Sequence, residues 1–389
     1  MKHFRIGVVL VFSMACGRAL AQEGISITHL PYIQGLTDTS VHIVWTTNKP
    51  STGWVELAPD DSTHFYYKER PKYFDSKYGF KMVGTVHTVE LRDLKPNTVY
   101  RYRVYSQEVL KHEGVQVEYG RVAATGVYRQ QPLRFKTTGG SGNVSFAVIN
   151  DIHGRNEVMN KLLDLADLPK TDFVVFNGDM ADNLLSEEQM FSAFMDTAIK
   201  RFASEKPMYY ARGNHETRGP FAVKYPQYFP TPTGELYYQL NLGKTNILVL
   251  DCGEDKPDSD IEYSGIVDMD HYRTRQAEWL KKAVETPEFK NASYKIVICH
   301  MPPFGGWHGE EDIFNKFVPI LNKAGVQVMI SGHFHRQVIR NADDKIRFPV
   351  VVNSNNNLIK ADLTEAGGLI RIIDQAGKTV EKINLQSLR

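Results

Sequence analysis

The pattern of apolar and polar positions divides the chain into two parts. In residues 25 to about 138, apolar and polar residues alternate in short runs such as "SVHIVWTT", "VYRYRVYS" and "LRFKTT". Residues two apart share one face of a strand, so we expect Val41, Ile43 and Trp45 to point into one core. Turn-forming Asn, Asp and Pro separate the runs, and helical periodicity is absent. The pattern predicts an all-β sandwich over residues 24–138.

Beyond Asn143 the pattern changes to uniformly apolar runs that alternate with helical stretches. The runs "VSFAVI", "FVVF", "MYYA", "NILVL", "KIVIC", "VQVMI" and "PVVV" predict strands that are buried on both faces. One helix is expected to begin at Ser186, where Gln189 completes a capping box, and another to end at Gly325. Residues 143–389 are therefore expected to form an α/β domain, joined to the sandwich by the flexible linker "TTGGSGN".

The first residues have the features of a targeting segment. "MKHFRIGVVLVFSMACGRALAQEG" combines a basic start, a short apolar core and the small-x-small sequence "ALA" before Gln22. This predicts a signal peptide over residues 1–21 and an exported protein, either periplasmic or secreted. In an alternative interpretation Cys16 carries a lipid, although Ser13 fits such a signal poorly. No segment approaches the roughly 20 apolar residues of a membrane-spanning helix.

The charge balance and the cysteines narrow the class of protein further. The 46 Lys and Arg residues nearly equal the 45 Asp and Glu residues, and no basic stripe is present, so we expect no nucleic-acid partner. After the predicted cleavage only Cys252 and Cys299 remain, each at the end of an apolar run, which is typical of buried thiols. A disulfide between them and the oligomeric state both stay open.

Polar side chains with ligand chemistry follow five of the predicted buried strands, most of them beside a glycine. Ligands bind outside the carboxyl ends of the strands in open α/β sheets, so these clusters converge on one edge if the strands are parallel neighbours. Seven side chains form the candidate set: Asp151, His153, Asp179, Asn214, His300, His333 and His335.

The chemistry of this set favours a metal centre. Oxygen and imidazole ligands without a thiolate suit Mn, Fe, Zn or Co. Seven ligands exceed the needs of one ion but suffice for two ions that share a carboxylate, about 3.5–4 Å apart, an arrangement used in phosphoryl transfer. Any one of these residues is more often a turn residue, a helix cap or a surface histidine. Their coincidence at five strand ends favours two divalent or trivalent ions, with Fe, Mn or Zn as candidates.

The ordered motifs resemble those of a known superfamily. "DIH", "NGDMAD", "GNHE", His300 and "GHFH" resemble the motif set of calcineurin-like metallophosphoesterases, from about Val144 to the mid-350s. The segments "LPYIQGLTDTSVHIVW" and "LKPNTVYRYRV" resemble the fibronectin-III-like domain that precedes the catalytic domain in purple acid phosphatases. The resemblance implies a fibronectin-III-like sandwich followed by two packed sheets flanked by helices, with the site along one edge.

The resemblance also assigns roles to individual residues. Asp179 would bridge two metals, and His215 would donate a proton to the leaving group or stabilise its developing charge. The other ligands would divide into two sets of three: Asp151, His153 and His335 at one metal, and Asn214, His300 and His333 at the other.

The chain departs from the purple subgroup at two positions. That subgroup has a glycine where His153 stands and a tyrosine ligand where Asp182 stands, and its colour comes from tyrosine bound to ferric iron. We therefore expect a colourless enzyme that combines the domain plan of a purple acid phosphatase with the metal site of the wider superfamily.

The expected activity is hydrolysis of a small phosphate ester by hydroxide held between the two ions, with His215 as general acid. A phosphomonoesterase of the acid phosphatase type is favoured, and a phosphodiesterase or nucleotidase is the alternative within the superfamily. A non-catalytic binder of phosphoryl ligands and an adhesion protein whose sandwich carries the function are alternatives from other classes. The presence of His215 argues against the first, and the intact ligand set against the second.

Four further residues are candidates for substrate binding. Arg155 and Arg218 lie just beyond ligand motifs and could pair with phosphate bidentately, or could be solvated loop residues. Trp307 and His308 lie in the loop "PPFGGWHGEED" and could form an aromatic pocket wall, or could simply pack.

Overall fold

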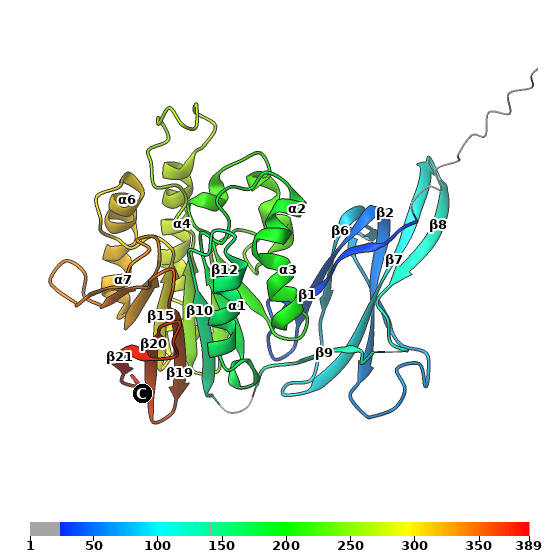
Figure 1. Ribbon diagram of the computed structural model, residues 1–389, viewed down its shortest axis with the longest axis horizontal. Helices are drawn as coiled ribbons and strands as arrows, with labels where there is room; N and C mark the ends of the chain where they lie inside the picture. The colour runs from blue at the N-terminus through cyan, green and yellow to red at the C-terminus, as the bar shows by residue number, and fades with distance from the viewer. Residues whose placement is uncertain (1–23, 129, 140–141, 389) are drawn as a thin grey trace, which may run out of the picture.

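The computed structural model describes residues 24–128, 130–139 and 142–388, which form a β-sandwich beside a larger α/β domain (Figure 1). The predicted signal peptide and Cys16 lie outside the described residues. Among these residues no helix is long and apolar enough to cross a membrane.

The sandwich is built around the long strand β2, which pairs with β1 and β6 along its first half and with β7 and β3 along its second. One strand thereby contributes to both layers. Val41, Ile43 and Trp45 are fully buried in its core, which confirms the predicted inward face. The strands are β1 Ile27–Gln34, β2 Val41–Pro59, β3 Lys72–Phe74, β4 Ser76–Lys77, β5 Phe80–Lys81, β6 Val83–Leu91, β7 Val99–Glu113, β8 Gln116–Ala124 and β9 Leu133–Lys136.

The α/β domain contains two six-stranded sheets, and each of the seven predicted buried runs forms a strand within them. In order across the first sheet lie β12 Met208–Ala211, β11 Phe173–Asn177, β10 Val144–Ile149, β19 Leu358–Thr364, β20 Gly367–Ile373 and β21 Thr379–Leu385. Across the second lie β13 Tyr238–Leu242, β14 Thr245–Leu250, β15 Tyr294–Cys299, β16 Val328–Ser331, β18 Val350–Val352 and β17 Val338–Arg340.

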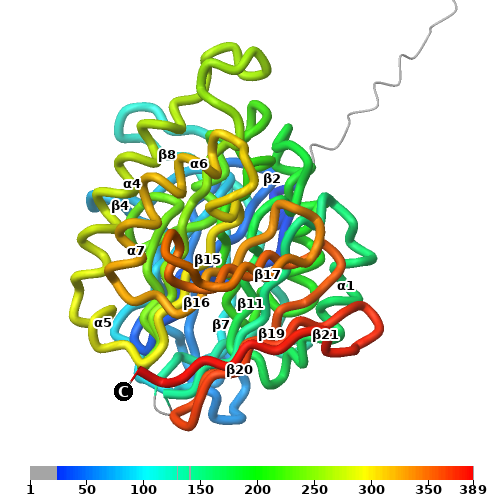
Figure 2. The backbone as a smooth tube through the Cα atoms, turned by 90° about the vertical axis from the view of Figure 1, so that its left-hand side faces the viewer, coloured from blue at the N-terminus to red at the C-terminus, as the bar shows by residue number. Residues whose placement is uncertain are grey.

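The strands that lead to the candidate site are parallel within each sheet. Strands β10, β11 and β12 are parallel neighbours in the first sheet, and β14, β15, β16 and β18 are parallel in the second. The C-terminal strands β19 to β21 were not predicted; they extend the first sheet in antiparallel pairing, with Val148 of β10 opposite Ile359 of β19 (Figure 2).

The sheets pack face to face through apolar residues such as Phe146, Val148, Ile298 and Ile330, all fully buried. Helices cover the outer faces, so the domain has four layers (Figure 1). On the first sheet lie α1 Asn156–Leu165, α2 Glu187–Met190 and α3 Asp196–Ala198. On the second lie α4 Met269–Ala283, α5 Pro287–Lys290, α6 His308–Lys316 and α7 Val318–Ala324.

Two predicted helix ends are confirmed, and two helices differ in detail. Ser186 Oγ accepts the backbone N–H of Gln189 at 3.1 Å, and Gly325 ends α7 with φ of 70°. Residues 187–203 form one helical run that includes π-helical turns at Phe191–Met195 and Ile199–Ala203. The helix predicted to end at Gly325 is instead divided near Phe317, before the proline at position 319 that cannot donate a helical hydrogen bond.

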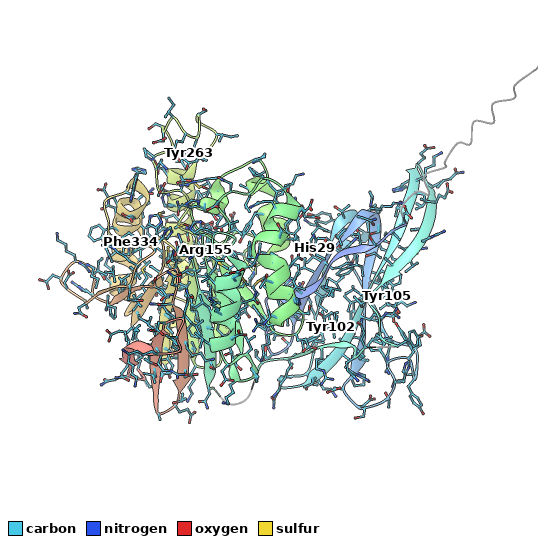
Figure 3. All side chains as sticks on the ribbon, in the orientation of Figure 1. His29, Tyr102, Tyr105, Arg155, Tyr263 and Phe334 are labelled. Carbon is cyan, nitrogen blue, oxygen red and sulfur yellow. The ribbon has the colours of Figure 1, made fainter. Side chains whose placement is uncertain are left out.

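The sandwich and the α/β domain share buried contacts. Tyr32 is fully buried within the core cluster of the α/β domain, and its hydroxyl donates to the carbonyl of Tyr228 at 2.9 Å. Tyr102 donates to the carbonyl of Ser204 at 2.6 Å, and the imidazole of His29 stacks on Phe191 at 3.6 Å (Figure 3). The helical run 187–203 is therefore held between the first sheet and β1.

Candidate metal centre

The predicted clusters meet at one edge of the α/β domain, as the strand-end argument requires. The carboxyl ends of β10, β11 and β12 bring residues from the first sheet, and those of β15 and β16 bring residues from the second. The edge therefore spans two packed sheets rather than a single one.

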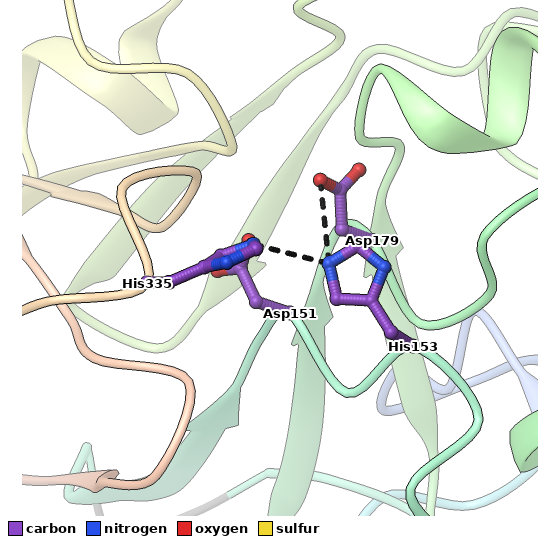
Figure 4. Close-up of side chains that lie close together, drawn as sticks. All are labelled: Asp151, His153, Asp179 and His335. Atoms are coloured by element: carbon purple, nitrogen blue, oxygen red, sulfur yellow. Dashed lines mark hydrogen bonds and ion pairs between the residues drawn. The ribbon is translucent and has the colours of Figure 1, made fainter.

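The first group of candidate ligands consists of Asp151, His153, Asp179 and His335, whose nitrogen and oxygen atoms all lie within 4.8 Å of one another (Figure 4). The Nε2 atom of His335 is 3.2 Å from Asp151 Oδ1 and 3.1 Å from the Nε2 atom of His153. Two imidazole nitrogens that converge with two carboxylates form a donor set suited to a borderline divalent cation.

A second group contains Asp179 again, together with His300 and His333. The Nε2 atom of His300 lies 3.1 Å from Asp179 Oδ2, while its Nδ1 atom is held by the carbonyl of Asn177 at 2.7 Å. This hydrogen bond places the proton on Nδ1 and leaves Nε2 as the ligand atom. Asp179 is thus the one member common to the two groups.

Asn214 lies next to the second group. Its amide nitrogen is 3.4 Å from Asp255 Oδ2, whereas its Oδ1 atom is buried and has no hydrogen-bond partner among the described residues. Buried polar atoms are almost always satisfied, so an unpartnered amide oxygen beside carboxylates and imidazoles fits a cation ligand. Together, the two carboxylates, four imidazoles and one amide oxygen fit metal binding.

The backbone around the centre is strained in a consistent way. Asp151, His153, Asp179, His333 and His335 have φ values of 53°, 49°, 54°, 73° and 55°. Each left-handed residue other than glycine costs roughly 1–2 kcal/mol, and such residues cluster at functional sites. The backbone conformations that direct these five side chains inward therefore lower the stability of the fold.

Glu216 is a structural element of the centre that sequence analysis did not identify. It is fully buried, and its carboxylate accepts the backbone N–H groups of Asp179, Met180, Ala181 and Gly213 at 2.7–3.2 Å. These bonds fix the turn that carries Asp179 against the turn that carries Asn214. The signal was its place in "GNHE", directly after two assigned residues.

The charges of the centre interact strongly. Burial opposes a charge on His300, but the carboxylates of Asp179 and Asp151 outweigh burial and raise its pKa to about 10. Burial and the neighbouring His300 lower the pKa of His333 to about 4. Burial acts to raise the pKa of Asp179, yet His300 holds that pKa well below its usual range. The buried ionised carboxylate of Asp179 requires positive charge beside it, which an imidazolium or a metal ion supplies.

His215 belongs to neither of these two groups but forms a third one with His153 and Asp182, whose ligand atoms also lie within 4.8 Å of one another. Its Nδ1 atom lies 2.8 Å from the carbonyl of Asp182, so Nδ1–H donates there and Nε2 faces the centre, 3.9 Å from Asp179 Oδ2. The Asp182 carboxylate lies 2.8 Å from Nδ1 of His153 and orients that ring. Asp182 therefore supports both histidines.

Both candidate arginines are engaged by the protein. Arg155 donates to the carbonyls of Asp151, Ile152 and Asn355, and so braces the turn that carries Asp151. Arg218 pairs with Glu254 at 3.0 Å and lies 3.3 Å from His215 Nε2. Binding of phosphate by either residue remains a prediction, and neither guanidinium has a free bidentate face.

The loop residues lie near the second group. Trp307 is 52% exposed, with the ammonium of Lys256 5.9 Å from its ring, and His308 contacts Asp270 at 2.7 Å. Glu310 was not predicted; it is fully buried, and its Oε1 atom lies 3.6 Å from His333 Nε2. Trp307 thus stays accessible to a substrate, while His308 is held by α4.

Comparison with known proteins agrees with the fold. The family model for calcineurin-like phosphoesterases matches residues 144–337, and that for the purple acid phosphatase N-terminal domain matches residues 28–121. The chain therefore contains a calcineurin-like phosphoesterase domain and has the domain arrangement of the purple acid phosphatases.

Three individual proteins are similar to the chain. Probable purple acid phosphatase 20 of Arabidopsis thaliana is 23% identical over 67% of this chain and 57% of its own length. Purple acid phosphatase 21 of the same plant is 26% identical over 69% of this chain and 58% of its own length. The chain therefore matches less than two thirds of these relatives. The structure of a purple acid phosphatase from yellow lupin (Lupinus luteus) seeds has the same fold, with a TM-score of 0.64, 15% identity and coverage of 92% of this chain and 74% of its own.

Proposed function

We propose that the protein is an exported phosphomonoesterase that uses two metal ions, held by the seven residues of the candidate metal centre. The observation that carries the proposal is the position of Asp179, whose carboxylate belongs to both ligand groups while His215 faces it from outside. Export rests on the signal-peptide pattern of residues 1–21.

The ligands divide as the two groups suggest. Asp151, His153 and His335 would hold one ion, Asn214, His300 and His333 the other, and Asp179 both. When bound, two such ions lower the pKa of water and neutralise charge on phosphate oxygens. Fe, Mn and Zn all accept this combination of oxygen and imidazole ligands.

The protein's own contribution to catalysis lies in positioning and proton transfer. The hydrogen bond of Nδ1 to the Asp182 carbonyl directs Nε2 of His215 toward the centre, where a proton on Nε2 could pass to the leaving oxygen. The bracing of the surrounding turns by Glu216 and Arg155 keeps the ligands in place, so little reorganisation is needed during the reaction.

The proposal is tested with metal-loaded protein and two aryl substrates, a phosphate monoester and a phosphodiester. We expect His215→Ala to retain both metals and to lose roughly 10²–10⁴-fold in kcat on the monoester. His271→Ala, at a surface histidine that is 79% exposed and pairs with Asp268, is the matched control and should keep full activity. Unchanged turnover in His215→Ala would remove this residue from the mechanism, and a preference for the diester would replace the phosphomonoesterase by a phosphodiesterase.

The absorption spectrum tests the predicted metal site separately. Asp182 occupies the position of the tyrosine ligand of the purple subgroup, and its carboxylate contacts His153. We expect no visible tyrosinate-to-iron band in fully loaded protein, including protein loaded with ferric iron. A band in the visible region that disappears on removal of iron would contradict this assignment.

A further inference from the structure

We propose that a cavity beside His215 receives the alcohol part of the substrate, and that the preferred substrates are phosphate monoesters of large apolar or aromatic alcohols. This inference rests on the proposed function, because it assumes that His215 faces the leaving group.

The cavity is lined by Arg218, which contacts His215, whereas His215 itself does not line it. It has a volume of about 890 Å³, and its lining includes Asn183, Thr217 and Arg218. Asn183 follows the residue whose carbonyl orients His215, and Arg218 Nη1 lies 3.3 Å from the Nε2 atom that would protonate the leaving oxygen. A group attached to that oxygen can therefore extend from the metal centre past Arg218 into the cavity.

The lining is chiefly apolar and is completed by a protruding loop. Tyr263 and Ile266 come from the loop that follows β14, which projects from the top of the domain (Figures 1 and 3). Val223 faces them from the opposite segment; it is 83% exposed and Ile266 is 87% exposed. Exposed aliphatic residues around a cavity of this size are typical of a binding site, because an apolar ligand group would bury them from water.

The charged side chains of the cavity are mostly paired within the protein. Arg218 donates to both oxygens of Glu254, at 3.0 and 3.2 Å, and to the hydroxyl of Tyr263 at 3.1 Å. Its positive charge is thereby neutralised and its planar group is held as part of the wall. The cavity is also lined by the carboxylates of Glu235, Glu262 and Asp268 and by the guanidinium groups of Arg212 and Arg275. Arg212 pairs with Asp251 at 2.9 Å and Glu262 with Lys256 at 3.0 Å, so most of these charges have partners in the protein.

The test compares phenyl phosphate with 4-methyl-, 4-ethyl- and 4-butylphenyl phosphate. The alkyl group changes the acidity of the phenol little, so differences in kcat/KM report contacts of the added methylenes. Burial of each added carbon is expected to raise kcat/KM about threefold, so the butyl ester, with four added carbons, should have an advantage of roughly 80-fold over phenyl phosphate.

Substitutions at the rim locate the source of this advantage. Ile266→Asp and Val223→Asp place a charge where the alkyl group would lie and should reduce the butyl-to-phenyl ratio of kcat/KM to about 1. Ile261→Asp is the matched control, because Ile261 lies in the same loop and is 90% exposed but does not line the cavity. This variant should keep the ratio of the unsubstituted protein.

The outcomes separate the two proposals. A ratio near 1 in the unsubstituted protein would overturn the inference and leave the proposed phosphatase intact. A high ratio that survives both rim substitutions would also overturn it, since the selectivity would then arise elsewhere. Failure of the metal-loaded protein to hydrolyse any of the four esters would remove the proposed function and the inference together.

Discussion

Two histidines with the same burial behave in opposite ways. His87 in the sandwich and His300 in the metal centre are both inaccessible to solvent. His87 stacks on Trp45 and contacts the hydroxyl of Ser51 at 2.9 Å, and burial lowers its pKa to about 4 although Asp75 lies 3.9 Å away. Burial acts on His300 in the same direction, yet its two aspartate neighbours raise the pKa to about 10.

The contrast shows that the surroundings, not burial, distinguish a core histidine from a candidate ligand. Neutral hydroxyls and an aromatic ring allow His87 to remain an uncharged core residue. At the edge of the sheets the carboxylate of Asp179 requires a positive charge, and the protein provides it with imidazoles that could equally bind metal ions. Two buried glutamates also differ in their surroundings. Glu56 in the sandwich has a carboxylate oxygen without a hydrogen-bond partner among the described residues, whereas Glu216 at the centre accepts four backbone N–H groups.

The largest expected effect on metal content and activity comes from replacing Asp179, whose carboxylate belongs to both ligand groups. We expect Asp179→Asn to lose at least one metal ion and to lower kcat/KM by about 10³-fold or more, since metal ions supply several kcal/mol of transition-state stabilisation. Metal content by elemental analysis and hydrolysis of an aryl phosphate measure the two effects.

Asp251→Asn is the matched control for this substitution. Asp251 is also a fully buried aspartate at a strand end, but it pairs with Arg212 at 2.9 Å and belongs to neither ligand group. The control variant should lose stability and keep its metals. Equal metal loss in both variants would show that Asp179 acts only through the fold.

The next largest effect is expected on stability and metal affinity when the buried Glu216 is replaced. Glu216→Gln replaces an acceptor of four backbone N–H groups by an amide with one acceptor oxygen, so at least one donor becomes unsatisfied. We expect a loss of roughly 3–5 kcal/mol in the free energy of unfolding and a metal affinity lowered about 10–100-fold. Denaturant titration and competition with a chelator provide the measurements.

Glu56→Gln serves for comparison, because Glu56 is also buried and its Oε2 atom accepts no hydrogen bond from the described residues. Its substitution should change the free energy of unfolding much less and leave metal affinity unaltered. Similar losses in the two variants would refute the supporting role of Glu216.

The smallest effect is the pH dependence that His87 contributes. Its pKa is about 4 in the folded protein and near the ordinary value of 6.5 when unfolded, so the unfolded state binds the extra proton between these values. Stability is fully present above pH 6.5 and is lost as the pH falls to about 4, by about 2–3 kcal/mol. In His87→Gln this part of the loss should vanish, which calorimetry of the whole chain between pH 7 and 4 can measure. An unchanged pH dependence would mean that His87 titrates normally.

The sequence predicted much of the fold because strong patterns carry it. Residues 146–149 and 296–299 are uninterrupted apolar runs that are typical of buried segments, and each forms most of a strand. Strands β19 to β21 were not predicted, because polar residues are interspersed among their apolar positions. Lys360 is only 4% exposed in β19, where its ammonium bonds Thr171, and this pairing cannot be inferred from a local pattern.

For the candidate site, the sequence predicted the identity of the ligand candidates but not their arrangement in space. The seven ligand candidates are visible because each follows a buried strand, whereas their arrangement over two packed sheets came only with the family resemblance. Glu216 and Glu310 were missed because their partners are backbone groups or distant side chains. The contacts of Arg155 and Arg218 likewise depend on loops far away in the chain, so their proximity to ligand motifs could not show that both are already paired.

The burial of Tyr32 in the core of the α/β domain shows that the sandwich and the α/β domain are not independent of one another. Its ring comes from the sandwich but packs with the α/β domain, and Tyr102 and Ser204 connect the same two parts by buried hydrogen bonds. Separation at the linker would expose this apolar surface and leave these polar groups without partners. The sandwich is therefore not an interchangeable attachment, because its first strand packs against the helical run 187–203 of the α/β domain.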